Sequence, residues 1–152
     1  LEVASERLTG KGAVRGVFKP QKTDERVEEV IDLLDLHDIA ERQPRDLSQG
    51  QRKMVGVGRA LVADSTKILL LDEPAAGLDK NETKWFGEQL RRLVDGGVTM
   101  LLVEHDMGLV LNVCDDIHML VFGELRASGS PEEMRNDPAV IAAYLGHSGG
   151  DQ

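Results

Sequence analysis

Ile68-Leu69-Leu70-Leu71-Asp72-Glu73-Pro74 is the stretch that decides the fold. Its continuous apolar run is typical of a strand buried on both faces of a parallel sheet. Val98 to Val103 forms a second apolar run. Between them, the capping box Asp79-Lys80-Asn81-Glu82 predicts the start of a helix that runs to about Asp95 and stops at Gly96-Gly97. Strand, helix and strand in this order predict a right-handed βαβ unit, and therefore an α/β fold.

Polar residues follow both predicted strands, at the carboxyl ends where ligand sites in such sheets lie. A rigid strand that presents one carboxylate to Mg²⁺ and a second to the attacking water suits phosphoryl transfer. We expect Asp72 to serve the metal and Glu73 to orient or deprotonate the water, although two surface carboxylates leaving a strand would look the same. His105 follows the second strand and could donate to a terminal phosphate. A lone histidine is nevertheless more often structural or exposed.

Leu47-Ser48-Gln49-Gly50-Gln51 forms a second chemical motif, and it opens a helix predicted after Pro44. The Ser48 hydroxyl and an unencumbered Gly50 amide at a helix N-terminus would form a small anion-binding concavity. An ordinary capped helix start is the alternative. Because such a motif would occur by chance in about one random chain per thousand of this length, it is the more specific of the two motifs.

Local signals predict the remaining elements. Thr23 is predicted to cap an amphipathic helix over residues 24–36, with apolar residues at helical spacing. Further elements are expected as a short helix near Met107–Val113, strands at Ile117–Phe122 and Glu124–Ala127 joined at Gly123, a helix capped by Ser130-Pro131-Glu132-Glu133, and a last helix from Asp137-Pro138 to Gly146.

Composition bounds the class of protein. A chain of 152 residues suffices for one domain, or it is a piece of one. Residues 1–22 carry a net charge of +3 and the remainder −12, so the acidic body argues against nucleic-acid binding. The single Cys114 fits a reducing compartment. Since no apolar stretch approaches the roughly 20 residues that span a bilayer, we expect membrane association to come through a partner.

These motifs, in this order and spacing, closely resemble those of ATP-binding cassette (ABC) ATPases, over about residues 44–146. Residues 47–51 resemble the signature motif, the strand ending at Asp72-Glu73-Pro74 resembles Walker B, and Ala76-Gly77-Leu78-Asp79 resembles the D-loop. Val103-Glu104-His105-Asp106 resembles the switch-histidine segment. The Glu-His-Asp-Met form at 104–107 and the tail at 137–146 are similar to the ATPase subunits of branched-chain amino acid importers. Urea-type importers and lipopolysaccharide exporters have similar tails.

The resemblance implies a role for each site residue. Ser48 and Gly50, with Gln51 beside them, would bind the γ-phosphate of ATP held by the opposite subunit. Asp72 would serve Mg²⁺, Glu73 the hydrolytic water, His105 the γ-phosphate, and Asp79 communication across the dimer. The sequence contains no Gly-x-x-x-x-Gly-Lys-Ser/Thr, the Walker A pattern, and no counterpart of the adenine-stacking aromatic or the Q-loop.

We therefore interpret the chain as the C-terminal part of an ABC ATPase domain, a partial P-loop NTPase core with parallel strands, flanking helices and part of the helical signature subdomain. The intact protein is expected to bind ATP and Mg²⁺ and to act at the cytoplasmic face of the inner membrane. Its expected partners are a second ATPase subunit, permease subunits and, indirectly, a periplasmic or extracellular solute-binding protein. The alternatives are a soluble cassette ATPase of DNA repair or translation and a non-catalytic half-cassette that contributes its signature to a partner. The predicted segments are 1–22 (irregular), 23–63 (helical subdomain and signature helix), 64–128 (second half of the α/β core) and 129–152 (C-terminal helices and tail).

Overall fold

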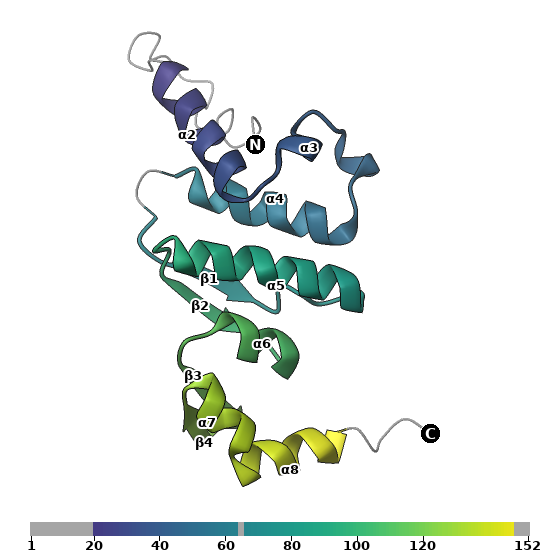
Figure 1. The fold of residues 1–152 in the computed structure, drawn as a ribbon, viewed down its shortest axis with the longest axis vertical. Coiled ribbons are helices and arrows are strands. Elements are labelled where there is room, and N and C mark those ends of the chain that lie inside the picture. The colour runs from purple at the N-terminus through teal and green to yellow at the C-terminus, as the bar shows by residue number, and fades with distance from the viewer. Residues whose placement is uncertain (1–19, 64–65, 148–152) are drawn as a thin grey trace. The chain divides into compact units, whose positions relative to one another are not determined.

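A computed structural model describes residues 20–63 and 66–147, and the chain divides into two compact units between Val103 and Glu104 (Figure 1). The predicted irregular segment lies outside the described residues up to position 19, as does most of the predicted tail. Each unit is described by itself below.

The first unit is mostly helical. Its longest helices are α5 and α2, and α4 packs against both of them. The helices are α2 (Pro20–Leu33), α3 (His37–Ala40), the 3-10 turn η1 (Pro44–Asp46), α4 (Gln49–Leu61) and α5 (Lys80–Asp95).

The predicted bounds of the first helix are wrong at both ends. Helix α2 starts at Pro20 and not after a cap at Thr23, because proline has the helical φ built in and lacks only an N–H that the first turn does not need. The helix stops at Leu33, two residues before Asp35, which takes a left-handed φ of 51°. A side chain in that conformation cannot continue a right-handed helix, so the apolar pattern extends beyond the helix itself.

Strands β1 (Leu69–Asp72) and β2 (Met100–Val103) pair in parallel and flank α5 in the sequence, as the βαβ prediction requires. The expectation that both strands are buried on both faces is wrong. Leu69 is buried, whereas Leu70 is 66% and Leu101 56% exposed. Side chains alternate between the faces of a strand, and only one face of β1 is covered within the described residues of this unit.

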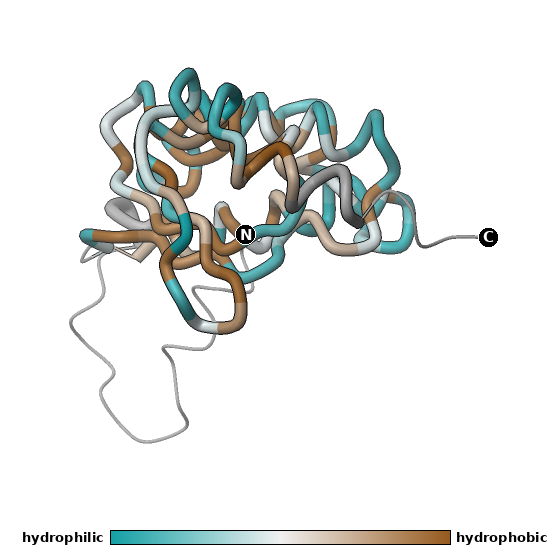
Figure 2. The backbone as a smooth tube through the Cα atoms, turned by 90° about the horizontal axis from the view of Figure 1, so that it is seen from below, coloured by the Kyte–Doolittle hydropathy of each residue, from teal (hydrophilic) through white to brown (hydrophobic). Residues whose placement is uncertain are grey.

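The core of the first unit lies where the helices meet one another and β1. Its fully buried large side chains are Phe86, Leu90 and Leu93 on α5 and Met54 on α4, together with Leu34 and Leu36 after α2. Figure 2 shows that single turns of the helices contain both hydrophobic and hydrophilic residues, as expected of helices with one buried and one exposed face.

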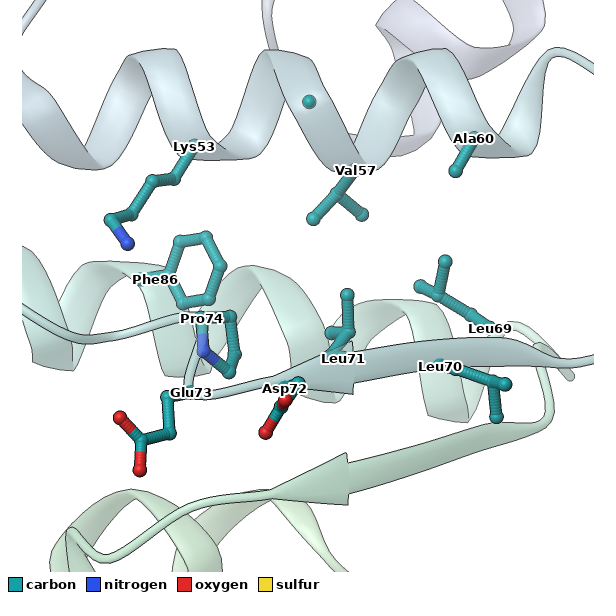
Figure 3. A pocket seen from close by; sticks show the side chains of 11 residues that line it. Lys53, Val57, Ala60, Leu69, Leu70, Leu71, Asp72, Glu73, Pro74 and Phe86 are labelled. Atoms are coloured by element: carbon teal, nitrogen blue, oxygen red, sulfur yellow. The ribbon is translucent and has the colours of Figure 1, made fainter.

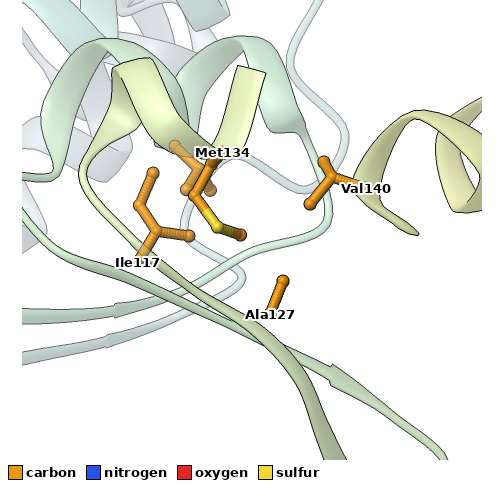
Figure 4. Close-up of a cluster of buried hydrophobic side chains, with 5 residues drawn as sticks. Ile117, Ala127, Met134 and Val140 are labelled. Carbon is orange, nitrogen blue, oxygen red and sulfur yellow. The ribbon is translucent and has the colours of Figure 1, made fainter. Parts of the chain in front are cut away.

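The second unit is a β-hairpin with short helices. Strands β3 (Ile117–Val121) and β4 (Glu124–Gly129) are antiparallel and are joined by Phe122-Gly123, both with positive φ, as the predicted turn at Gly123 requires. The hairpin packs with helices through a cluster of Val110, Ile117, Ala127, Met134 and Val140 (Figure 4). The helices are α6 (Met107–Val113), α7 (Pro131–Asn136) and α8 (Pro138–His147).

The predicted caps of this unit are confirmed. Ser130 accepts from the Glu133 amide and completes a capping box, and Asp137 accepts from Ala139 at 2.7 Å. Among the helices within residues 20–63 and 66–147, none has the length and apolar character needed to cross a membrane.

Leu90→Ala tests whether α5 anchors the first unit. The side chain is fully buried, so its truncation should lower the free energy of unfolding by about 2–5 kcal/mol. Leu101→Ala, at an exposed position of the same unit, is the matched control and should cost less than about 1 kcal/mol. Urea unfolding followed by the fluorescence of Trp85, the single tryptophan, measures both variants. Equal losses would contradict this description of the core.

Candidate functional site

The signature motif forms the start of α4. Ser48 is the N-cap, its hydroxyl accepts from the Gln51 amide at 3.3 Å, and the Gln51 side chain accepts from the Ser48 amide at 3.0 Å. Both halves of a capping box are therefore present. The simpler interpretation of this motif, a capped helix start, is thus confirmed, and it leaves an anion-binding role open because the helix dipole still points at the same place.

The sequence predicted an unencumbered Gly50 amide, and this expectation is wrong. The amide donates to Oε1 of Glu82 on α5 at 3.1 Å, across 32 residues of sequence. Gly50 is buried, and a Cβ placed there would lie 3.5 Å from Cβ of Glu82. The N-termini of α4 and α5 are thus in contact at Gly50, where a Cβ would meet Glu82 at an ordinary van der Waals distance.

Asp79 caps α5 as predicted. Its Oδ1 accepts from the amides of Asn81 at 2.8 Å and Glu82 at 2.9 Å, while Oε2 of Glu82 accepts from the Asp79 amide at 3.4 Å. The carboxylate of Glu82 therefore contacts the first turns of two helices, α5 through Asp79 and α4 through Gly50. Sequence reasoning identified Glu82 as a capping residue but missed its second partner, which only the packing of α4 on α5 reveals.

The loop before α5 also touches the signature segment. Gly77 has a φ of 78°, and a Cβ built there would lie 2.9 Å from Nε2 of Gln49. This conformation, together with the close approach, explains why glycine occupies the position. The loop from Asp72 to Asp79 and the signature segment are consequently neighbours within one chain.

Asp72 and Glu73 lie at the carboxyl end of β1, as predicted. Asp72 is the last residue of the strand and is in register with Val103, and the Glu73 amide donates to the Val103 carbonyl at 2.9 Å. Both carboxylates are exposed. Glu73 has a φ of 43°, a left-handed conformation that costs on the order of 1 kcal/mol for a residue with a side chain. The pairing with β2 holds the residue in this strained position.

These two carboxylates fit the donors that Mg²⁺ uses, since it is commonly bound by one or two carboxylates, with phosphate and water supplying the other oxygens. Within the described parts of the chain, no group of three or more His, Cys, Asp and Glu side chains could hold a metal ion.

A cavity of about 320 Å³ opens between α4 and β1 (Figure 3). Leu69 and Leu71 point toward Val57 and Ala60 of α4, which makes this part of the wall apolar. Lys53, Asp72 and Glu73 also line the cavity, although the carboxylates of Asp72 and Glu73 point away from α4 in Figure 3. The sequence did not single out Lys53, because its place in the cavity depends on how α4 packs.

His105 belongs to the second unit. Its side chain is 76% exposed, whereas the neighbouring Glu104 side chain is only 1% exposed, and Oε2 of Glu104 accepts from the His105 amide at 3.2 Å. Asp106 caps α6 by accepting from the Leu109 amide at 3.0 Å. His105 is thus presented to solvent, and its action together with Asp72 and Glu73 stays a prediction.

Hydrogen bonds shift the titration of two carboxyl groups. The Gly50 amide, followed by the Ser48 side chain, lowers the pKa of Glu82. In the second unit the Ser130 amide and side chain lower the pKa of Glu133. Both glutamates are capping-box residues that accept from backbone amides, which favours their charged forms.

Comparisons with known proteins give a consistent result. A family model described as ABC transporter matches residues 2–76, and one described as Branched-chain amino acid ATP-binding cassette transporter matches residues 127–149. The chain is 41% identical over 119 residues to the high-affinity branched-chain amino acid transport ATP-binding protein LivG of Salmonella typhimurium, and this match covers 78% of the chain and 46% of the relative. LivG of Escherichia coli K12 is 39% identical over 156 residues, with 97% of the chain and 61% of the relative covered.

Among solved structures, the ADP conformation of MJ1267, an ATP-binding cassette of an ABC transporter, superimposes with a TM-score of 0.73 at 27% identity. The match covers 94% of this chain and 60% of that structure. The predicted fold, a partial cassette core, is thereby confirmed. The chain spans about half to three-fifths of the length of the proteins it matches.

Gly77→Ala tests the contact between the D-loop segment and the signature. The positive φ should cost on the order of 1–2 kcal/mol, and Gln49 must also move. Gly97→Ala is the matched control, because Gly97 has a φ of 90° with nothing within 4 Å of a built Cβ. We expect Gly77→Ala to lower the free energy of unfolding more than Gly97→Ala does. In the double variant Gln49→Ala/Gly77→Ala, the loss should be smaller than the sum of the losses in the two single variants. Additive effects in the double variant would argue against the contact.

The pH dependence of stability tests the Glu82 contacts. The pKa of Glu82 lies below its ordinary value of 4.5, so its contribution to stability is complete above about pH 4.5 and is lost as the pH falls through the lowered value. Glu82→Gln should therefore flatten the decline of the unfolding midpoint below pH 4.5. Glu88→Gln, which removes the ion pair of Glu88 with Lys84 on the same helix, should keep the wild-type slope. Thermal unfolding between pH 3 and pH 6 measures these midpoints. The same pH dependence of the midpoint in both variants would contradict the Glu82 contacts.

Proposed function

The chain belongs to the ATP-binding cassette (ABC) transporter family, and from that premise we propose that it forms part of the ATP-binding and ATP-hydrolysing subunit of an importer for branched-chain amino acids. The observation that carries the proposal is that one unit contains the signature helix, the β1 carboxylates and the D-loop segment. Within that unit, Glu82 is hydrogen-bonded to the N-termini of both α4 and α5. The substrate class is supported by the names of the LivG relatives and by the family model that matches residues 127–149.

In this proposal the chain serves two nucleotide sites. Ser48 and Gly50, with Gln51 beside them, bind the γ-phosphate of an ATP molecule held by the opposite subunit, at the positive end of the α4 dipole. Asp72 holds Mg²⁺, which supplies neutralisation of charge on the phosphate oxygens. Glu73 orients or deprotonates the attacking water, and its exposed position at the end of β1 leaves room for that water.

Two further residues complete the assignment. His105, exposed at the start of the second unit, donates to the γ-phosphate. Asp79 fixes the start of α5 and communicates between the two sites of a dimer. The subunit pairs with a second ATPase subunit and binds permease subunits at the cytoplasmic face of the membrane, and a solute-binding protein acts on the other side.

The nucleotide needs a phosphate loop from outside these 152 residues, because none of their glycine and lysine positions forms the Walker A pattern. The 152-residue chain by itself should therefore bind ATP only weakly. A titration with a fluorescent ATP analogue tests this statement, and micromolar affinity would refute it.

Reconstitution tests the signature role. The chain is mixed with full-length E. coli LivG whose own signature serine is replaced by arginine, so that ATP hydrolysis depends on the signature of this chain. We expect ATP hydrolysis in the mixture and a loss of at least about tenfold with Ser48→Arg, since a bulky cation replaces the hydroxyl at the phosphate position.

Ser130→Arg is the matched control, because Ser130 is also an N-cap with a capping box but belongs to the second unit. It should leave hydrolysis within about twofold of the wild-type mixture. No hydrolysis in the wild-type mixture, or equal losses with both variants, would count against the proposed function.

A further inference from the structure

The donors at the first turn of α4 are bound to acceptors of the same chain. The Ser48 amide donates to the Gln51 side chain, the Gln51 amide to the Ser48 hydroxyl, and the Gly50 amide to Glu82. The first two bonds form an ordinary capping box, which many helices contain. The third is different, because its acceptor is a charged group from another helix.

Glu82 binds the Gly50 amide, one of the groups that the proposed function assigns to a phosphate. Its Oε1 accepts from the Gly50 amide at 3.1 Å, and Ser48, the N-cap of the same helix, contributes to the lowered pKa of Glu82. Carboxylates and phosphates are both oxyanions that take N–H and O–H donors, and both are stabilised at a helix N-terminus. The two anions therefore compete for one place.

We propose that Glu82 is an internal anion that occupies the place beside the Gly50 amide, and that a phosphate group must displace it to reach the N-terminus of the signature helix. The inference rests on the proposed function, because the role of Ser48 and Gly50 toward phosphate is part of that function. A site that is filled from within binds its ligand with an apparent affinity reduced by the fraction of time it is free.

The geometry allows displacement without loss of the helix cap. The second oxygen of Glu82, Oε2, accepts from the Asp79 amide at 3.4 Å, and Asp79 itself caps α5 through Asn81 and the Glu82 amide. Rotation of the Glu82 carboxylate away from Gly50 leaves in place the two bonds that Asp79 accepts from the Asn81 and Glu82 amides, because they do not involve that carboxylate. Glu82 can therefore leave Gly50 while Asp79 continues to cap α5.

The experiment uses the whole 152-residue chain labelled with ¹⁵N-glycine and inorganic tripolyphosphate as the probe. The Gly50 amide signal is assigned by its loss in Gly50→Ala, a substitution that brings Cβ only to ordinary contact distance from Glu82. Glu82→Gln keeps an acceptor oxygen but removes the charge. We expect the Gly50 signal to shift in this variant and the tripolyphosphate concentration at half-maximal response to fall by about three- to tenfold.

Two further variants complete the test. Glu133→Gln changes the corresponding capping-box glutamate of the second unit and should titrate like the wild type. Glu82→Asp keeps the charge but shortens the reach to Gly50, so it should also lower the midpoint, and it replaces Glu82→Gln if that variant does not fold. Equal midpoints in the wild type and in the folded Glu82 variants would overturn the proposal. So would a Gly50 signal that does not respond to tripolyphosphate in any of them.

The result separates this inference from the proposed function. ATP hydrolysis by the LivG mixture combined with equal tripolyphosphate midpoints would refute the internal anion and keep the ATPase role. A lowered midpoint in Glu82→Gln without any hydrolysis by the mixture would refute the ATPase role and keep the internal anion.

Discussion

The close approach of two helix N-termini is the constraint on which the first unit depends. The N-termini of α4 and α5 lie next to each other, and each carries a partial positive charge. Glu82 compensates these two positive charges, because one of its oxygens accepts from Gly50 at the start of α4 and the other accepts from Asp79 at the start of α5. Met54 on α4 and Phe86 on α5, both fully buried in the core, help to keep the helices together.

Parallel pairing of β1 with β2 sets the position of the two carboxylates. Asp72 is the last paired residue of its strand, and Glu73, whose amide donates to the Val103 carbonyl, takes a left-handed conformation. Such strain persists only where the surroundings determine the backbone, and it is often found at functional sites. The strand thus presents Asp72 and Glu73 to solvent instead of leaving them on the flexible end of a loop.

Local signals predicted what depends on neighbouring residues. The capping boxes at Asp79 and Ser130 and the turn at Gly123 were predicted from the sequence because each is fixed by a few adjacent residues. The parallel pairing of the strands was predicted from the order of strand, helix and strand. The start of α2 was not, since Pro20 and Thr23 are both good signals and periodicity does not choose between them. The bond between Gly50 and Glu82 spans 32 residues and depends on how two helices pack, which no local pattern contains.

The signature and the carboxylates also influence each other through a short path. Gln49 lies against Gly77, and Glu82 holds Gly50 and Asp79, so the segment between Asp72 and Asp79 is anchored to the start of α4 at two points. A movement of α4 relative to α5 would therefore change the contacts of the loop that follows Glu73. Under the proposed function, a phosphate at the signature of α4 would therefore act on the loop after Asp72 and Glu73 through contacts within this chain, in addition to any contact between subunits.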